Sequence, residues 1–302
     1  MFLSVFADPR RFRPDEFKAR SLAMIDAIKS QTERHAEVLA LASSAAEIPQ
    51  IAATGKIAVL MGLEGGHTIT DDLALLAQFH ELGVRYMTLT WSNTHNWADS
   101  SSDEARHDGM TAFGYDVVRE MNRLGMMIDV SHASDNTVRD VLEATAAPII
   151  ASHSSARALV DVPRNLSDDL LRAIAENGGL VMINFGGSMI DVRMSGTLRI
   201  IQHSILHVGI PPTPLDYLLN HIDHVVLVAG IDHVGLGSDF DGTLFMPEGL
   251  RDVAGFPNIT AALQARGYSD DHIRKILEEN LLHVFAKVES VARDAQRLGQ
   301  GR

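Results

Sequence analysis

The 302-residue chain is acidic and contains no cysteine. Its formal net charge of −13 gives it no electrostatic attraction to nucleic acid or to an anionic membrane surface, so neither is an expected partner. Apolar residues make up 46% of the sequence, which allows a large buried core and excludes global disorder. Without cysteine, thiolate chemistry is excluded and any metal site must use nitrogen and oxygen ligands.

Neither end of the sequence carries a targeting signal that we recognise. The first residues, MFLSVFADPRRFRP, have no basic region ahead of their short apolar run, and the last ones, AKVESVARDAQRLGQGR, are too polar for a lipid-anchor signal. No segment has the roughly twenty consecutive apolar residues of a membrane span. We therefore expect a soluble, cytoplasmic protein.

Short β-prone runs alternate with longer amphipathic runs along the chain. In chain order, the predicted strands are 2–6, 57–64, 84–91, 125–132, 148–153, 179–185 and 233–239. The predicted helices are 14–42, 71–83, 111–125, 135–147 and 167–178, with loop plus helices over 190–225 and a helical C-terminal region from about 268 to 302. Ser167 is a predicted N-cap, and Gly83, Gly125 and Gly178 are predicted helix stops. No linker interrupts this rhythm, so one domain over 1–302 is expected.

The alternation predicts parallel βαβ units, and the strands read as the continuous apolar runs of a sheet buried on both faces. Polar residues that can bind metal end four of these runs: Glu64, His132, His153 and Asp239. In a (β/α)8 barrel the carboxyl ends of all strands meet at one face, where chemistry takes place. A TIM-type barrel is therefore the predicted fold, although only seven strands are found.

Two histidines at the ends of consecutive strands are the main sign of chemistry. A lone histidine beside an apolar run is usually a core or surface residue, but neighbouring barrel strands would place His132 and His153 roughly 5–7 Å apart, within reach of one divalent ion. Glu64 adds an oxygen ligand, and Asp239 is the better candidate for an active-site base because Asp241 precedes a glycine and is predicted in a turn. This set predicts a metal-dependent hydrolase.

Several collinear motifs resemble the renal or membrane dipeptidases, which are zinc-dependent barrel enzymes of the amidohydrolase-like superfamily. The resemblance runs from about residue 2 to residue 287 and is carried by EGGH (64–67), RYMTLTW (85–91), WADS (97–100), NRLGMMIDVSHAS (122–134), PIIASHSSARAL (148–159), RNLSDD (164–169) and GSDFDG (237–242).

The resemblance implies a role for each matching residue. Glu64 corresponds to the carboxylate that bridges two zinc ions, and His132 and His153 correspond to the histidines of the second zinc. Asp239 matches the aspartate that handles the proton of the attacking water, and Arg164 matches the arginine that binds the terminal carboxylate of the substrate. The implied reaction is hydrolysis of a dipeptide, in some cases with a C-terminal D-residue, by a metal-activated hydroxide. Family members also often form homodimers.

The chain departs from the family near its start. The family has an H-x-D pair on its first barrel strand, whereas residues 1–10 align with the second strand, so the first zinc site keeps only Glu64. The sequence HID at 221–223 lies in a helical run and is predicted to be structural. We expect the natural chain to be longer; the alternative is a metal-poor barrel remnant that acts as a binding protein.

The second departure is at Trp91, where the family commonly has a histidine that contacts the substrate. His95, four residues later, is either a replacement or, as we prefer, a solvated loop residue. A metallohydrolase of another amide or of a lactam is a further alternative. The predicted loops near 92–110 and 186–215 carry no readable code for side-chain preference.

Overall fold

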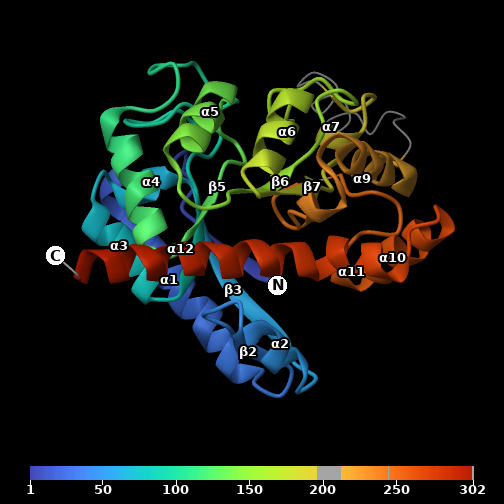
Figure 1. Cartoon of the computed structure of the whole chain (residues 1–302), viewed down its shortest axis with the longest axis horizontal. Helices are drawn as coiled ribbons and strands as arrows, with labels where there is room; N and C mark the ends of the chain where they lie inside the picture. Colours follow the sequence, from blue (N-terminus) through green and yellow to red (C-terminus); the bar gives the residue numbers. More distant parts are fainter. Residues whose placement is uncertain (196–211, 244, 301–302) are drawn as a thin grey trace. The chain divides into compact units, whose positions relative to one another are not determined.

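The computed structural model describes residues 1–195, 212–243 and 245–300, and parallel strands alternate with helices along them (Figure 1). The chain divides into two compact units. Unit 1 comprises Met1–Ile149 and Leu282–Arg302, and unit 2 comprises Ile150–Leu281. Within the described ranges, no helix combines the length and the apolar character needed to cross a membrane.

Unit 1 contains five strands centred on β3. Its elements are β1 (Phe2–Phe6), α1 (Pro14–Arg34), β2 (Leu39–Leu41), α2 (Glu47–Ala52), β3 (Ile57–Glu64), the 3-10 helix η1 (Gly66–Ile69), α3 (Leu73–Glu81), β4 (Val84–Thr88), α4 (Ala112–Leu124), β5 (Met127–Asp129), α5 (Asp135–Ala144) and, from Leu282, most of α12 (Asn280–Gln300). β3 pairs in parallel with β1, β2 and β4, and β4 pairs in parallel with β5. The order of the main strands therefore follows the chain, as in a (β/α) barrel.

Two helix ends in unit 1 follow local sequence signals. Ser134 caps α5 by accepting a hydrogen bond from the backbone N–H of Thr137. Gly125 ends α4 with a φ of 77°, a left-handed conformation that favours glycine. The C-terminal helix α12 runs beside the end of α4 (Figure 1), where Gln296 donates a hydrogen bond to the carbonyl of Arg123. In this unit, capping residues thus set helix ends, and a side-chain hydrogen bond joins α12 to α4.

Unit 2 is built on three parallel strands. Its elements are β6 (Ile150–Ser154), α6 (Asp168–Glu176), β7 (Leu180–Asn184), α7 (Gly187–Ile190), α9 (Leu215–Ala229), η2 (Ile231–His233), β8 (Val234–Gly237), η3 (Val253–Gly255), α10 (Phe256–Ala265), α11 (Asp270–Arg274) and the π-helix η4 (Lys275–Glu279). β7 pairs with β6 and with β8. Ser167 caps α6 and Gly178 follows it with a φ of 79°, as the sequence predicts.

The strands β2 and β5 depart most from the prediction. β2 was expected to be part of one helix over 14–42, but α1 ends at Arg34 and backbone hydrogen bonds of 2.8 Å then join residues 38–42 to β3. This pairing is a long-range contact, which periodicity does not reveal. β5 was expected over 125–132 but ends at Asp129, because the chain turns there and Ala133 donates its N–H to the carbonyl of Val130.

The C-terminal part is helical from Asp270 to Gln300, which agrees with the predicted region. The predicted loop-plus-helix stretch 190–225 is only partly described: residues 196–211 lie outside the described residues, and α9 occupies the end of the stretch. The predicted loop near 186–215 is likewise only partly described, because it includes residues 196–211.

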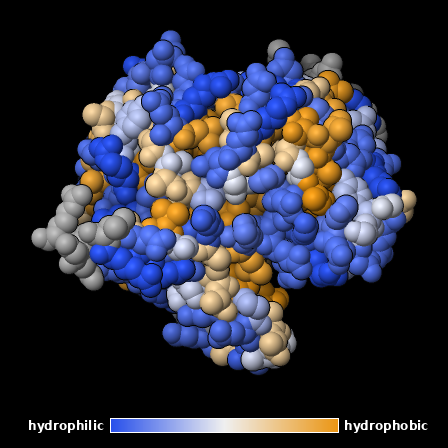
Figure 2. Space-filling model, in the orientation of Figure 1, coloured by the Kyte–Doolittle hydropathy of each residue, from blue (hydrophilic) through white to orange (hydrophobic). Residues whose placement is uncertain are grey.

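Hydrophilic residues dominate the face shown in Figure 2, and apolar residues lie mainly between them.

Each unit buries a histidine in its apolar interior. His95 in unit 1 is 9% exposed and donates from Nε2 to the carbonyl of Leu89 at 2.8 Å. His221 in unit 2 is 1% exposed, and its Nδ1 accepts the N–H of Ala156 at 3.0 Å. Burial lowers the pKa of both imidazoles to about 4. His221 thus has the structural role that was predicted for the HID sequence.

These histidines should destabilise the protein in acid. The unfolded chain takes up a proton near pH 6.5, whereas the buried rings resist protonation down to about pH 4, so the free energy of unfolding falls as the pH drops through that window. The variant His221→Asn keeps an acceptor without a titrating group. Between pH 7 and pH 5 it should lose less unfolding free energy than the parent, by up to about 2 kcal/mol. Urea unfolding followed by circular dichroism measures this difference.

The control is His283→Asn, which replaces an exposed histidine and should leave the pH response of the parent unchanged. An identical pH response of His221→Asn and the parent would contradict the account.

Candidate metal centre

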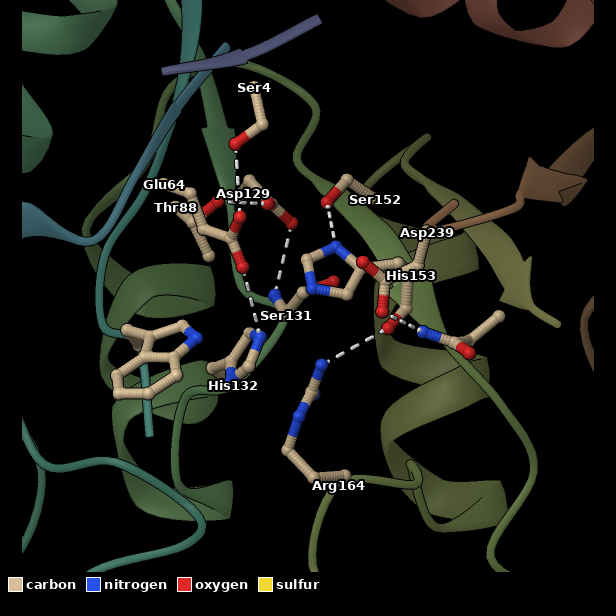
Figure 3. A network of polar contacts seen from close by, with 12 residues as sticks. Ser4, Glu64, Thr88, Asp129, Ser131, His132, Ser152, His153, Arg164 and Asp239 are labelled. Carbon is tan, nitrogen blue, oxygen red and sulfur yellow. Dashed lines mark hydrogen bonds and ion pairs between the residues drawn. The ribbon is translucent and has the colours of Figure 1, made fainter. Parts of the chain in front are cut away.

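A carboxylate and an imidazole face each other in unit 1. Glu64 is the last residue of β3, and its Oε1 lies 3.4 Å from Nε2 of His132 (Figure 3). The hydroxyl of Ser4 on β1 donates to the other oxygen, Oε2, at 3.0 Å. Glu64 is half-buried and His132 is buried. The glutamate side chain is therefore held from one side while its second oxygen is directed at the histidine.

The backbone of His132 is held in an uncommon conformation. The residue lies three positions after the end of β5, not on the strand end as predicted, and its φ is 70°. Its carbonyl accepts the N–H of Ser101 at 2.7 Å and the hydroxyl of Ser100 at 3.2 Å. Such left-handed conformations cost free energy in non-glycine residues and cluster at functional sites. The loop around residue 100 thus fixes the imidazole next to Glu64.

The distance between these two groups fits a shared ion. It is longer than the 2.7–3.2 Å range of an ordinary N–H···O hydrogen bond. Two ligand atoms on a tetrahedral zinc ion, each about 2.1 Å from the metal, are separated by roughly 3.4 Å. The oxygen and nitrogen donors of Glu64 and His132 therefore match the ligand chemistry and the spacing of a divalent metal.

Unit 2 positions His153 inside β6, where strand geometry directs its ring. Its Nδ1 lies 2.7 Å from the hydroxyl of Ser152, a contact that fixes the ring orientation in the way that hydrogen-bond partners orient metal-binding histidines. The guanidinium of Arg164 donates from Nη2 to the carbonyl of the same histidine at 3.3 Å. Two predicted site residues, His153 and Arg164, are thus brought together in this unit (Figure 3).

Asp239 lies two residues after β8, in the same unit. Asn184, the last residue of β7, donates from Nδ2 to Oδ2 of Asp239 at 3.0 Å. The approach requires glycine at 237, because a Cβ there would lie 2.0 Å from the carbonyl oxygen of Ser152 and 3.0 Å from Cα of His153. The chain that carries Asp239 therefore passes directly against the histidine strand. Asp241 is exposed with a φ of 70°, as expected for a turn residue.

The loop after β4 does not supply a solvated histidine. His95 packs its ring 4.5 Å from that of Trp97 and is buried, so the prediction of a solvated residue is wrong, and its Nε2 is bound to backbone. Trp91, in contrast, lies beside His132: its ring centroid is 6.4 Å from that of His132. The neighbouring His67 donates to the carbonyl of Ala7 at 2.9 Å and ties the glycine loop to the end of β1.

The two glycines after Glu64 allow the backbone path and the close packing of this loop. Gly65 has a φ of 100°, and a Cβ on Gly66 would meet the carbonyl of Leu89 at 2.5 Å and the ring of Trp97 at 2.4 Å. The residues that sequence analysis missed are the supporting polar groups Ser4, Ser152 and Asn184. Isolated polar residues within strands carry no motif, so no signal in one sequence singles them out.

Comparisons with known proteins agree on one family. The sequence profile of the membrane dipeptidases (peptidase family M19) matches residues 1–298. Dipeptidase 3 of Rattus norvegicus is 39% identical over 276 residues, which cover 90% of this chain and 52% of that protein. The chain spans about half the length of the curated relatives it matches.

Solved structures show the same fold. The probable dipeptidase PvdM from Pseudomonas aeruginosa is 27% identical, with a TM-score of 0.87 over 96% of this chain and 86% of that one. A metallo peptidase from Rhodobacter sphaeroides, solved with a phosphinate mimic of the dipeptide L-Ala-D-Ala, is 31% identical, with a TM-score of 0.81 over 92% of this chain and 76% of that one. The predicted α/β barrel fold class is confirmed, and the chain belongs to the membrane dipeptidase family, peptidase family M19.

Proposed function

We propose that this protein is a zinc-dependent dipeptidase. The observation that carries the proposal is the 3.4 Å approach of Glu64 to His132, with the second glutamate oxygen held by Ser4. Family membership supplies the reaction class, hydrolysis of a peptide bond between two amino acids.

Glu64, His132 and His153 hold the metal. His153 joins the other two because it lies next to the carboxyl end of the strand that follows β5 in chain order, and the carboxyl ends of consecutive barrel strands meet at one face. Nitrogen and oxygen donors without cysteine suit zinc at a catalytic site, where a ligand position stays open. When bound, the ion supplies Lewis-acid polarisation of the peptide carbonyl and activation of a water molecule.

Asp239 manages the proton of the attacking water. Its carboxylate is a general base held in place by the amide of Asn184, which engages one of the two oxygen atoms. The other oxygen, Oδ1, takes the proton and returns it to the leaving amine. The uncommon backbone of Asp239, with a φ of 55°, is a further sign that this carboxylate is positioned for a function.

Arg164 binds the free carboxylate of the substrate. A planar guanidinium forms paired hydrogen bonds with a carboxylate, and the contact of Arg164 with the carbonyl of His153 keeps it beside a metal-binding residue. We also propose that a D-residue is accepted at the C-terminal position. The phosphinate mimic of L-Ala-D-Ala bound by the Rhodobacter sphaeroides relative supports this substrate class.

Metal binding should depend on Glu64 and His132 and, to a smaller extent, on Ser4. His132→Asn suits the positive φ, so it removes the imidazole without adding backbone strain. Glu64→Gln and His132→Asn should each lower zinc retention during dialysis and reduce kcat/KM for a dipeptide more than about 100-fold. Ser4→Ala should weaken zinc binding roughly 10- to 100-fold, because it frees the carboxylate to rotate.

Atomic absorption and amino-acid release measure these effects. The control is Glu278→Gln, an exposed glutamate that should change neither quantity. Full zinc retention in both Glu64→Gln and His132→Asn would refute the metal site. Zinc binding without hydrolysis of any dipeptide would instead support a non-catalytic barrel.

Arg164 should matter only when the substrate has a free C-terminal carboxylate. Arg164→Met should lower kcat/KM for Gly-D-Ala about 10- to 100-fold, the value of one or two hydrogen bonds between charged groups, and should change turnover of Gly-D-Ala amide little. The control Arg172→Gln alters an arginine of α6 whose side chain is 53% exposed. Equal losses for the free acid and the amide would contradict the assignment.

A further inference from the structure

An arginine is clamped next to the metal-binding pair of unit 1. The guanidinium carbon of Arg10 lies 4.6 Å from the ring centroid of Trp91. Asp8 holds the guanidinium along one edge: Nε donates to Oδ1 at 3.0 Å and Nη2 donates to Oδ2 at 2.9 Å. Trp91 itself packs 5.1 Å from Phe6 and 6.4 Å from His132 between ring centroids. The order of groups is therefore metal ligand, indole and arginine.

The clamp leaves part of the cation available to a ligand. The Arg10 side chain is 70% exposed, and its Nη1 makes no hydrogen bond or ion pair within the described part of the chain. Asp8 carries one negative charge between Arg10 and Arg11, whose Nε lies 3.7 Å away, so the cluster keeps a net charge of +1. Stacking on an aromatic ring and a paired carboxylate both pre-organise an arginine, which reduces the entropy lost on binding.

We propose that Arg10 and Trp91 form a subsite that selects an acidic side chain in the N-terminal residue of the dipeptide. This inference rests on the proposed function, in which Arg164 already takes the C-terminal carboxylate. The methylene groups of a glutamyl side chain pack against the part of the half-buried Trp91 that Arg10 leaves uncovered, and its carboxylate accepts hydrogen bonds from Nη1 of Arg10. Trp91 stands where the resemblance places a histidine, so this chain has an aromatic wall in place of a polar group.

The test compares two nearly isosteric ligands, Glu-Ala and Gln-Ala, as analogues whose peptide bond is reduced to CH2–NH and cannot be hydrolysed. The chain has two tryptophans, and Trp97→Phe leaves Trp91 as the only indole, so its fluorescence reports binding to the zinc-loaded protein. The Glu-Ala analogue should bind about three- to tenfold more tightly, and added salt should reduce the difference because the arginine is exposed.

Arg10→Gln should bring the two affinities to within about twofold. Arg11→Gln, which changes an arginine that is 80% exposed and close to the same aspartate, should keep the preference. Calorimetry on the protein with both tryptophans repeats the comparison if Trp97→Phe fails to fold. Equal binding of the two analogues, binding of neither, or a preference that survives in Arg10→Gln would each overturn the subsite.

Hydrolysis distinguishes this inference from the proposed function. The ratio of kcat/KM for Glu-Ala to that for Gln-Ala should fall in Arg10→Gln and not in Arg11→Gln. Tight binding of the Glu-Ala analogue without hydrolysis of either dipeptide would support the subsite and refute the dipeptidase. Hydrolysis of both at equal kcat/KM would support the dipeptidase and refute the subsite.

Discussion

The register of the parallel strands in unit 1 is the constraint on which the candidate metal site of that unit depends. Phe6 pairs with Glu64, Glu64 with Thr88, and Thr88 with Asp129, so the ends of four strands lie at one level. The hydroxyl of Thr88 donates to Asp129 at 2.6 Å along this line. A shift of one residue in β3 would turn Glu64 to the opposite face of the sheet, because side chains alternate along a strand. Backbone pairing, more than any local motif, thus places the carboxylate.

The strand register alone does not place His132 or Asp239; local turns of the chain do. β5 stops early, and the chain turns so that His132 reaches Glu64 from beyond the strand end. In unit 2, the glycine at 237 lets the turn that carries Asp239 approach the backbone of His153. In both cases the residue proposed to act has a left-handed backbone conformation: φ is 70° for His132 and 55° for Asp239. These strained positions coincide with the residues that are proposed to act, which is where strain is expected to be retained.

Much of the fold could be predicted because its signals are local. Continuous apolar runs marked seven strands, and Ser167, Gly125 and Gly178 marked helix ends that the structure shows. β2 was missed because three residues carry no periodicity and are held by pairing with β3. The candidates Glu64 and His132 followed from their position after apolar runs, whereas Ser4 could not be found, because its role arises only when β1 lies beside β3.

In the proposed subsite, Trp91 and Arg10 change selectivity while the residues proposed to hold the metal remain. The chain as a whole carries a formal charge of −13, yet the segment after β1 gathers three arginines within four residues. Asp8 neutralises one of these charges and directs Arg10 over the indole. The tryptophan therefore provides both an apolar wall and a support for the cation. Substrate choice can thus differ among relatives that share the same reaction.

The most direct measurement is a crystal structure of the zinc-loaded protein with diffraction data on both sides of the zinc absorption edge. The account predicts an anomalous peak bonded to a carboxylate oxygen of Glu64 and to ring nitrogens of His132 and His153, each at about 2.0–2.2 Å. A peak bonded to other residues, or full zinc loading with none of these three side chains bound to the ion, would contradict it.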